Sequence, residues 1–242
     1  MSGVGVLDKA VAILAFLSTD GPAPLAGVVE GTGMPRPTVY RLLSALETHH
    51  LVARDGGRYS LGLRLFGWGN RAAGTNMVEA ARPVLTALRD ETGESTQLYV
   101  REGEDRICVA SVERATGLKT TVPVGAVMPL ARGSAGKVLI SWAEDRGRWA
   151  DLVGGSELEC IRERGWAESV AEREEGVASV SAPVFDGSGR VVSAAVGASG
   201  PIARLGQRPG GRLAGRVVAA AREIERALGE RREPQREGRG SV

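Results

Sequence analysis

Apolar residues recur at helical spacing in the stretch just before residue 48. Four of them stand at i, i+3, i+4 and i+7: Val39, Leu42, Leu43 and Leu46. This spacing predicts a helix with one buried face. Proline lacks the backbone N–H and fits only the first turn of a helix, so Pro35 and Pro37 place its start near Arg36.

The other side of this predicted helix is polar and cationic: Thr38, Arg41, Ser44, Ala45 and Thr48. Residues 24–30 before it form a short apolar pattern that predicts another helix, and the glycine-containing residues 31–33 predict a turn between the two. Helix, short turn and helix is the helix-turn-helix arrangement, in which the second helix enters the DNA major groove.

A hairpin is predicted directly after this pair. Asp55, Gly56 and Gly57 separate two apolar runs, which is a strong signal for a tight turn. A hairpin in this place is a wing, and Arg54 and Arg58 flank its tip. The alternative is a small helical core with a solvated arginine face, but three helices and a wing in this order favour DNA binding. The candidate DNA-binding residues are Arg36, Pro37, Thr38, Tyr40, Arg41, Ser44, Arg54 and Arg58.

Helical spacing also predicts a first helix marked by Leu7, Ala10, Val11, Leu14 and Leu17. The remaining elements follow from the local period of the apolar residues. The expected helices are 77–92, 137–142, 146–152, 157–164 and 211–228. The expected strands are 95–101, 106–113, 118–122, 177–185 and 190–198, with residues 166–167 extended.

Strand pairs interrupted and framed by helices predict an α+β domain with an antiparallel sheet. We therefore expect four parts. A winged helix-turn-helix DNA-binding domain spans 1–66, and a linker with a linker helix spans 67–92. An effector-sized α+β domain spans 93–229, and a disordered tail spans 230–242, where apolar residues are lacking.

The net charge of the 242-residue chain is only +2, but its distribution is uneven. Residues 67–200 carry fifteen basic and nineteen acidic side chains, so we expect no DNA contact there. Between residues 36 and 64 five arginines face only Glu47 and Asp55, which is the local positive charge that phosphate contacts require. The small surplus predicts modest affinity per subunit, so two or more subunits are expected to bind together.

The cysteines and the apolar runs limit the other possibilities. Cys108 and Cys160 lack metal-ligand spacing, and Cys108 is expected to be a small buried apolar residue. No signal peptide is recognised, and charged residues interrupt every apolar run well short of a membrane span. We expect a cytoplasmic, nucleoid-associated protein without a membrane partner, a metal or a cofactor.

Three features could suggest catalysis, and none supports it. His49 and His50 are the only histidines, so the second domain alone cannot form a Ser-His-Asp triad. Residues 133–137 resemble a phosphate-binding loop but have the wrong spacing between glycines. The carboxylates Glu172, Glu174 and Glu175 are expected to lie in a solvated acidic turn. No catalytic residue is therefore assigned.

The motifs taken together resemble the IclR family of bacterial transcription regulators. In the first domain they are residues 32–35, 38–43 and 59–62, and in the second they are 129–137, 176–184 and 199–205. The resemblance implies a GAF-like effector domain, dimers or dimers of dimers, and a small organic acid or related metabolite as ligand. Residues 3–10, 92–95, 106–110 and 165–167 are similar to the branch that controls leucine and other amino-acid biosynthesis genes in high-GC bacteria.

By the same motif match, Gly133, Ser134 and Ala135 line the ligand pocket, where their backbone N–H groups can approach a carboxylate. The other implied effector-binding residues are Tyr99, Ser179, Gly197 and Ser199. The family often has histidine where this chain has Arg132. That arginine either favours an anionic ligand or is a surface charge.

We expect a DNA-binding regulator, a homodimer or homotetramer, whose operator affinity changes when a small molecule binds the second domain. The linker helix is expected to alter the spacing between paired recognition helices. Two alternatives remain at this level: a DNA-bound scaffold with a degenerate pocket, and a metabolite-processing enzyme fused to a DNA-binding domain. The missing catalytic constellation argues against the enzyme.

Overall fold

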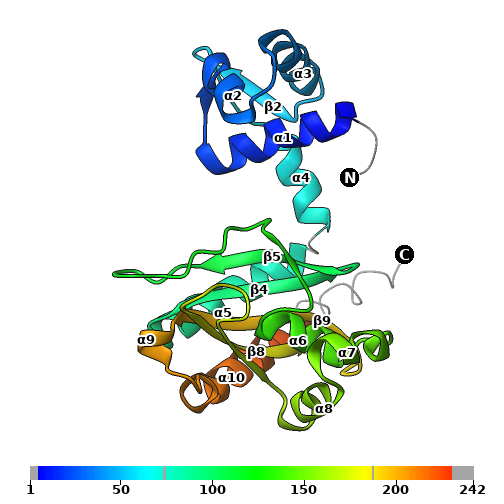
Figure 1. Cartoon of the computed structure of the whole chain (residues 1–242), viewed down its shortest axis with the longest axis vertical. Coiled ribbons are helices and arrows are strands. Elements are labelled where there is room, and N and C mark those ends of the chain that lie inside the picture. The colour runs from blue at the N-terminus through cyan, green and yellow to red at the C-terminus, as the bar shows by residue number, and fades with distance from the viewer. Residues whose placement is uncertain (1–4, 73–74, 187, 231–242) are drawn as a thin grey trace, which may run out of the picture. The chain divides into compact units, whose positions relative to one another are not determined.

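The computed structural model describes residues 5–72, 75–186 and 188–230 (Figure 1). The chain divides into two compact units, residues 1–74 and 75–242. Of the tail expected at 230–242, residue 230 ends a helix, and residues 231–242 lie outside the described residues. The fold class is α+β, as the sequence predicts.

The N-terminal unit contains four helices and a small sheet among its described residues. The helices are α1 (Gly5–Asp20), α2 (Leu25–Thr32), α3 (Arg36–Thr48) and α4 (Leu63–Ala72). The strands are β1 (Ala23–Pro24), β2 (Val52–Asp55) and β3 (Arg58–Leu61), which form an antiparallel sheet in the order β1-β3-β2. This is a winged helix-turn-helix.

The apolar core of this unit brings the three helices and the wing together. Its fully buried members include Ile13, Val28, Val39, Leu43 and Val52. The first helix expected from Leu7 to Leu17 is present as α1, although Leu7 and Val11 are 59% and 54% exposed. The apolar side of α1 is wider than the surface it meets, and the contact is centred on Ile13 and Leu17.

The two turns of the motif depend on glycine. Gly33 ends α2 with φ of 65°, and its N–H donates to the Val29 carbonyl oxygen, so α2 extends to Thr32 and the turn is shorter than predicted. In the wing, Gly56 and Gly57 have φ of 53° and 77° between paired Asp55 and Arg58. Two consecutive positive φ values suit a two-residue hairpin turn, which confirms the predicted wing.

The C-terminal unit is built on a six-stranded antiparallel sheet in the order β6-β5-β4-β9-β8-β7. The strands are β4 (Ser95–Glu102), β5 (Asp105–Val112), β6 (Val127–Pro129), β7 (Ala167–Val170), β8 (Val177–Phe185) and β9 (Val192–Pro201). The helices are α5 (Thr75–Thr92), α6 (Ser134–Ser141), α7 (Ala150–Val153), α8 (Gly155–Arg164), α9 (Ile202–Leu205) and α10 (Gly210–Glu230), with a 3-10 turn η1 (Arg146–Trp149).

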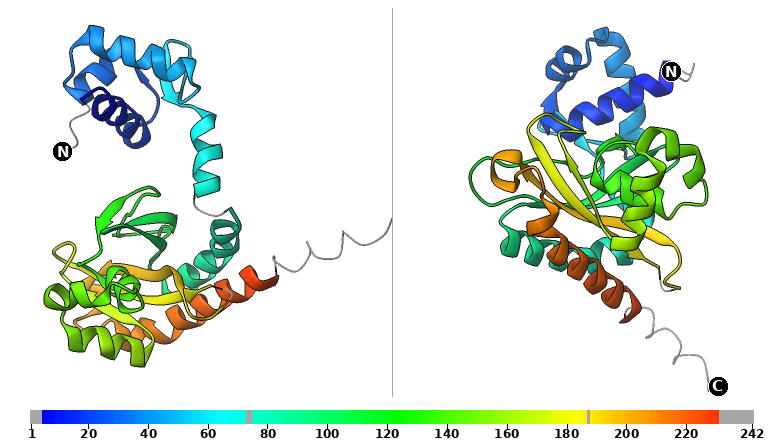
Figure 2. Two further views of the ribbon diagram at one scale, coloured as in Figure 1. Left: turned by 90° about the vertical axis from the view of Figure 1, so that its right-hand side faces the viewer. Right: turned by 60° about the horizontal axis from the view of Figure 1, so that its bottom comes forward.

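Helices cover both faces of this sheet (Figure 2). The long helices α5 and α10 pack on one face, where Leu98, Val180 and Val196 are fully buried. The shorter α6 and α8 lie over part of the other face, where Cys108 and Ala195 are fully buried. Side chains alternate along a strand, so the residues next to Leu98, Val180 and Val196 in their strands point to the face that carries α6.

The predicted strand 118–122 was wrong. Residues 113–126 are irregular, and the edge strand that pairs with β5 is β6, at Val127–Pro129. Before it, the Cys108 N–H donates to the Ala126 carbonyl and the Gly125 N–H donates to the Cys108 carbonyl. These hydrogen bonds fix the path of the loop beside β5. They, and not the apolar residues at 118–122, determine that pairing with β5 begins at Val127.

Candidate functional site

The recognition helix α3 exposes the side that the sequence predicts for DNA. Arg36, Pro37, Tyr40 and Arg41 are exposed, and Tyr40 keeps 52% of its surface accessible. Thr38 and Ser44 are half-buried at the edge of that side. The buried side packs into the core through Val39, Leu43 and Leu46. The cationic surface of α3 therefore lies outside the N-terminal core.

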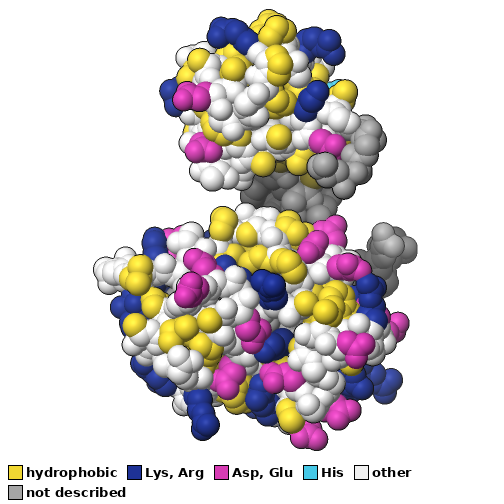
Figure 3. Space-filling model, in the orientation of Figure 1, with side chains coloured by type: hydrophobic (Ala, Val, Ile, Leu, Met, Phe, Trp, Pro, Cys, Tyr) yellow, Lys and Arg dark blue, Asp and Glu magenta, His cyan; other side chains and the backbone are white. Residues whose placement is uncertain are grey.

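The two wing arginines differ in their contacts. The Arg54 guanidinium lies 5.4 Å from the centre of the Tyr59 ring and is exposed to solvent. The Arg58 guanidinium donates to the Pro22 carbonyl oxygen, so it also ties the wing to the segment before α2. On the face in Figure 3, basic side chains lie near the top of the N-terminal unit and acidic ones lie lower on its sides, and both signs mix over the C-terminal unit.

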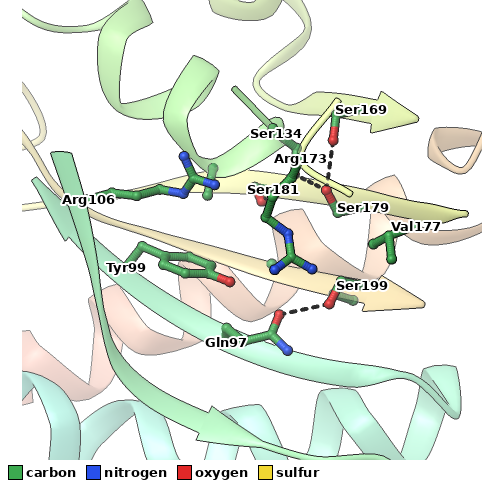
Figure 4. A pocket seen from close by; sticks show the side chains of 14 residues that line it. Gln97, Tyr99, Arg106, Ser134, Ser169, Arg173, Val177, Ser179, Ser181 and Ser199 are labelled. Carbon is green, nitrogen blue, oxygen red and sulfur yellow. Dashed lines mark hydrogen bonds between the residues drawn. The ribbon is translucent and has the colours of Figure 1, made fainter. Parts of the chain in front are cut away.

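The C-terminal unit contains a small polar cavity whose water-accessible volume is about 20 Å³. All seven predicted effector-binding residues line it: Tyr99, Gly133, Ser134, Ala135, Ser179, Gly197 and Ser199. The sequence did not indicate the other lining residues: Gln97, Arg106, Ser169, Arg173, Val177, Ser181 and Ala198. Figure 4 shows that they converge from the sheet, the start of α6 and the turn between β7 and β8.

Strand register explains why these residues meet. Ser199 of β9 pairs with Ser179 of β8, and Ser179 pairs with Ser169 of β7. Two residues along β9, Gly197 lies between Gln97 of β4 and Ser181 of β8. Because side chains alternate, these rows share the face opposite the α5 and α10 core. Sequence reasoning missed Gln97, Ser169 and Ser181 because their place at the cavity depends on how separate strands pair. The spacing of residues along one strand does not reveal that pairing.

Serine hydroxyls form a connected network on this face. The Ser134 hydroxyl oxygen lies 2.8 Å from those of Ser179 and Ser181, and the Ser169 and Ser179 hydroxyl oxygens are 3.0 Å apart. The Ser199 hydroxyl donates to Gln97 Oε1 over 3.1 Å. A hydroxyl can both donate and accept, so this wall can reorient its hydrogen bonds toward a ligand's oxygen atoms.

The start of α6 is shaped by glycine and held by a carboxylate. Gly133 has φ of 83°, and a Cβ at Gly136 would overlap the Leu130 carbonyl oxygen. The Glu172 carboxylate accepts from the Gly133 N–H at 3.0 Å and from Lys137 Nζ at 2.5 Å. The solvated-turn interpretation of residues 172–175 was therefore wrong for Glu172, although Glu174 and Glu175 are exposed.

Arg106 is a buried cation at the cavity wall. It is 2% exposed, its NH1 group donates to the Pro129 and Arg132 carbonyls, and its guanidinium lies 5.6 Å from the centre of the Tyr99 ring. Burial and then the nearby charge of Arg173 lower the pKa of Arg106, opposed by Tyr99. Burial raises the pKa of Tyr99, whose hydroxyl stays protonated at neutral pH. Arg132 itself is exposed and does not line the cavity, which supports its interpretation as a surface charge.

Three buried nitrogen atoms of cavity-lining residues have no hydrogen-bond partner among the described residues: Arg106 Nε, Gln97 Nε2 and one terminal nitrogen of Arg173. Buried donors are nearly always satisfied in native proteins, so unsatisfied donors gathered at one cavity indicate a missing partner. No acidic residue lines this cavity among the described parts of the chain. The site is thus suited to a small ligand that carries acceptor oxygens and negative charge.

A winged helix-turn-helix joined to an α+β unit with a polar internal cavity defines a ligand-responsive DNA-binding regulator as the class of protein. The family models agree. The IclR helix-turn-helix domain matches residues 6–56, and the C-terminal domain of bacterial IclR transcriptional regulators matches residues 70–151 and 155–226. The chain belongs to the IclR family. It is a DNA-binding transcriptional regulator with a C-terminal effector-binding domain.

Individual relatives match along nearly their whole length. The glycerol operon regulatory protein of Streptomyces griseus is 30% identical over 241 residues, which cover 92% of this chain and 94% of that relative. The structure of the Thermotoga maritima IclR has a TM-score of 0.73 at 24% identity, covering 93% and 99% of the two chains. An IclR homolog of Microbacterium hydrocarbonoxydans in complex with 4-hydroxybenzoate has a TM-score of 0.74 at 19% identity, covering 93% and 99%. These two structures support the fold.

The relatives are regulators rather than enzymes, which removes the enzyme alternative. Both histidines are exposed at the end of α3, remote in sequence from the cavity residues. Among the described residues, no helix combines the length and apolar character needed to cross a membrane.

Proposed function

We propose that the cavity of the C-terminal unit binds a small organic acid and that its occupancy changes how firmly α3 is retained on operator DNA. The observation that supports this most is the set of buried nitrogen atoms without hydrogen-bond partners on Arg106, Gln97 and Arg173. An acid would bring the acceptors that these donors lack. The residues proposed to contact it are Tyr99, Gly133, Ser134, Ala135, Ser179, Gly197 and Ser199. A relative's complex with 4-hydroxybenzoate supports an acid as the class of ligand.

On the DNA side, α3 is proposed to enter the major groove. Its N-terminal end presents Arg36 and Thr38, and a helix N-terminus with a neighbouring cation favours phosphate. Arg41 and Ser44, farther along the helix, are placed to read base edges, and Tyr40 adds exposed contact area. Arg54 and Arg58 of the wing would contact the DNA backbone. Pro37 completes the proposed set at the first turn.

The units are joined in sequence by α4 and α5, which provide a path for coupling. We infer that the bound acid changes subunit packing and that this change alters the distance between paired recognition helices. Operator half-sites one or more helical turns apart, each about 34 Å, make retention sensitive to that distance. A cytoplasmic place beside the nucleoid follows from this proposal.

Two subunits or a pair of dimers are proposed to act together. Leu7 and Val11 lie four residues apart on α1 and are exposed, and residues at this spacing share one side of a helix. A second copy of the chain would cover this apolar strip. Analytical ultracentrifugation tests this: Leu7→Gln together with Val11→Gln should shift the protein toward monomer, and an unchanged sedimentation coefficient would contradict it.

The similarity to the branch that controls amino-acid biosynthesis supports branched-chain amino acids and their 2-oxo acids as the first ligands to test. Operator fragments are recovered by selecting genomic DNA on the purified protein, and the retention of these fragments is then measured with each compound. Calorimetry that detects binding together with altered retention supports the proposal. Retention that no acid changes favours the alternative of a DNA-bound scaffold with a degenerate pocket.

A further inference from the structure

We infer that the effector is a short aliphatic acid with two negatively charged groups, such as a small dicarboxylate, rather than an aromatic or singly charged acid. This inference rests on the proposed role of the cavity and adds the chemical class of its ligand. It is carried by two guanidinium groups that enter one cavity from different elements, Arg106 of β5 and Arg173 of the turn between β7 and β8.

The first cationic group, Arg106, has no carboxylate partner. Its contacts are to carbonyl oxygens, to the Met128 sulfur and to the Tyr99 ring, and no ion pair within 4.0 Å forms in the described part of the chain. A buried charge is normally paired, because an unpaired charge is costly to remove from water. Its Nε lacks any hydrogen-bond partner. One negative group of the ligand would supply the missing partner.

The second group, Arg173, reaches the cavity from another side. Figure 4 shows its guanidinium directed toward Gln97 and Ser199, below the serine network. One terminal nitrogen is buried without a hydrogen bond and lies 3.5 Å from a carboxylate oxygen of Glu174, whose side chain is 64% exposed. That weak, solvent-screened pair leaves most of the charge of Arg173 available. The unpartnered Gln97 Nε2 adds a donor beside it.

The two arginines that line the cavity repel one another. As a consequence, the charge of Arg173 contributes to lowering the pKa of Arg106. A monoanion neutralises only one of them, whereas an acid with a charge at each end neutralises both. The charge of Glu172 opposes this lowering of the pKa of Arg106, but Glu172 forms no ion pair with Arg106 within 4.0 Å; its carboxylate is held by Lys137 and the Gly133 N–H, and it does not line the cavity.

The wall between the arginines is polar. Five serines line it, and its apolar members are small apart from Tyr99 and Val177. An aromatic ring needs apolar surface on its faces, and against this wall it would remove hydroxyl groups from water without giving them partners. A short aliphatic chain that carries oxygen atoms fits the wall better. These features select against an acid such as 4-hydroxybenzoate.

The test compares matched acids on the full-length protein by calorimetry at constant ionic strength. Succinate, malate, glutarate and adipate are each paired with the acid in which one carboxylate is replaced by a methyl group: butyrate, 3-hydroxybutyrate, pentanoate and hexanoate. 4-Hydroxybenzoate serves as the aromatic probe. We expect at least one dicarboxylate to bind about tenfold or more tightly than its partner, the size of a charged hydrogen-bond contact.

Arg173→Gln should reduce the affinity for that dicarboxylate by a similar factor and leave the monoacid unchanged. Arg173 lies in a turn, so folding is checked by thermal melting, and Arg132→Gln is the control because Arg132 is exposed outside the cavity. Three results would overturn the inference: no dicarboxylate binds, the paired affinities are equal, or 4-hydroxybenzoate binds best. If Arg173→Gln leaves the ratio of the dicarboxylate affinity to the monoacid affinity unchanged, the assignment of Arg173 to the second negative group is overturned. Monoacid binding that changes DNA retention would leave the proposed function intact.

Discussion

Gly197 of β9 lies directly opposite Ser181 of β8 on the floor of the cavity. A Cβ atom at Gly197 would overlap the Ser181 hydroxyl oxygen and come within 2.9 Å of the Val180 carbonyl oxygen. The absence of a side chain at this position therefore keeps the serine network in place and the cavity open.

Gly197→Ala should abolish acid binding, because the added methyl displaces Ser181 and fills the cavity floor. Overpacking of this kind costs about 1–3 kcal/mol in the free energy of unfolding. Calorimetry and urea denaturation measure the two effects. Gly215→Ala is the matched control, since Gly215 lies exposed on α10 and no neighbouring side chain comes within 4 Å of the place that its added methyl would take. Unaltered acid binding in the Gly197 variant would contradict the site.

Arg41→Ala should weaken retention of the operator by about tenfold to a hundredfold per subunit, the loss expected for a groove contact of about 1–3 kcal/mol. Acid affinity should be unchanged, because the cavity lies in the other unit. Fluorescence anisotropy with operator fragments measures the change. Arg216→Ala on α10 removes an exposed arginine from the C-terminal unit and should have no effect. Equal losses in both variants would indicate a nonspecific charge effect instead of a groove contact.

The thiols should differ in reactivity. Burial raises the pKa of Cys108 to about 12, whereas Cys160 is exposed on α8. Only the thiolate is the nucleophile, so at neutral pH native protein should consume about one equivalent of a thiol reagent per chain. Cys160→Ser should consume none until the protein unfolds. Rapid labelling of the Cys160→Ser variant would mean that the β5 face opens readily.

Asp145 provides a pH-dependent contribution to stability. Its carboxylate accepts two hydrogen bonds from the Arg101 guanidinium, at 2.7 and 2.6 Å, and these lower its pKa from the ordinary 3.8. The contribution is therefore present above the unfolded pKa and lost as pH falls through the lower folded value. Asp145→Asn should destabilise the protein at neutral pH, with a difference from wild type that shrinks below about pH 4.

Urea denaturation across this pH range makes the comparison, with Asp151→Asn on the exposed surface of α7 as the control. A destabilisation by Asp145→Asn that stays constant down to the most acidic pH would show that packing, and not ionisation, is responsible.

Much of the fold was available from local patterns. The period of Val39, Leu43 and Leu46 predicted α3, and the glycine pair at 56–57 predicted the wing turn, because both signals act within a few residues. The prediction of a strand at 118–122 was wrong, because the position of an edge strand depends on which segment can hydrogen-bond to the neighbouring strand. Here β5 pairs with Val127–Pro129.

The cavity residues likewise divide into those that local sequence motifs predicted and those that depend on distant parts of the chain. Motif matching named seven lining residues, but Gln97, Ser169 and Ser181 reach the cavity only through the register of separate strands. Arg106 looked like an ordinary strand residue, and Arg173 lay in a segment interpreted as a solvated acidic turn. Neither position carries a local signal of burial, because the burial comes from elements distant in sequence.

The central claim is that occupancy of the cavity controls retention on DNA. The direct measurement is the dissociation constant of the protein for a genome-selected operator fragment, with and without a saturating acid that calorimetry has identified. We expect a change of about fivefold or more, typical of coupled sites, that disappears in Gly197→Ala. A dissociation constant that stays the same while calorimetry shows the cavity filled would contradict the claim.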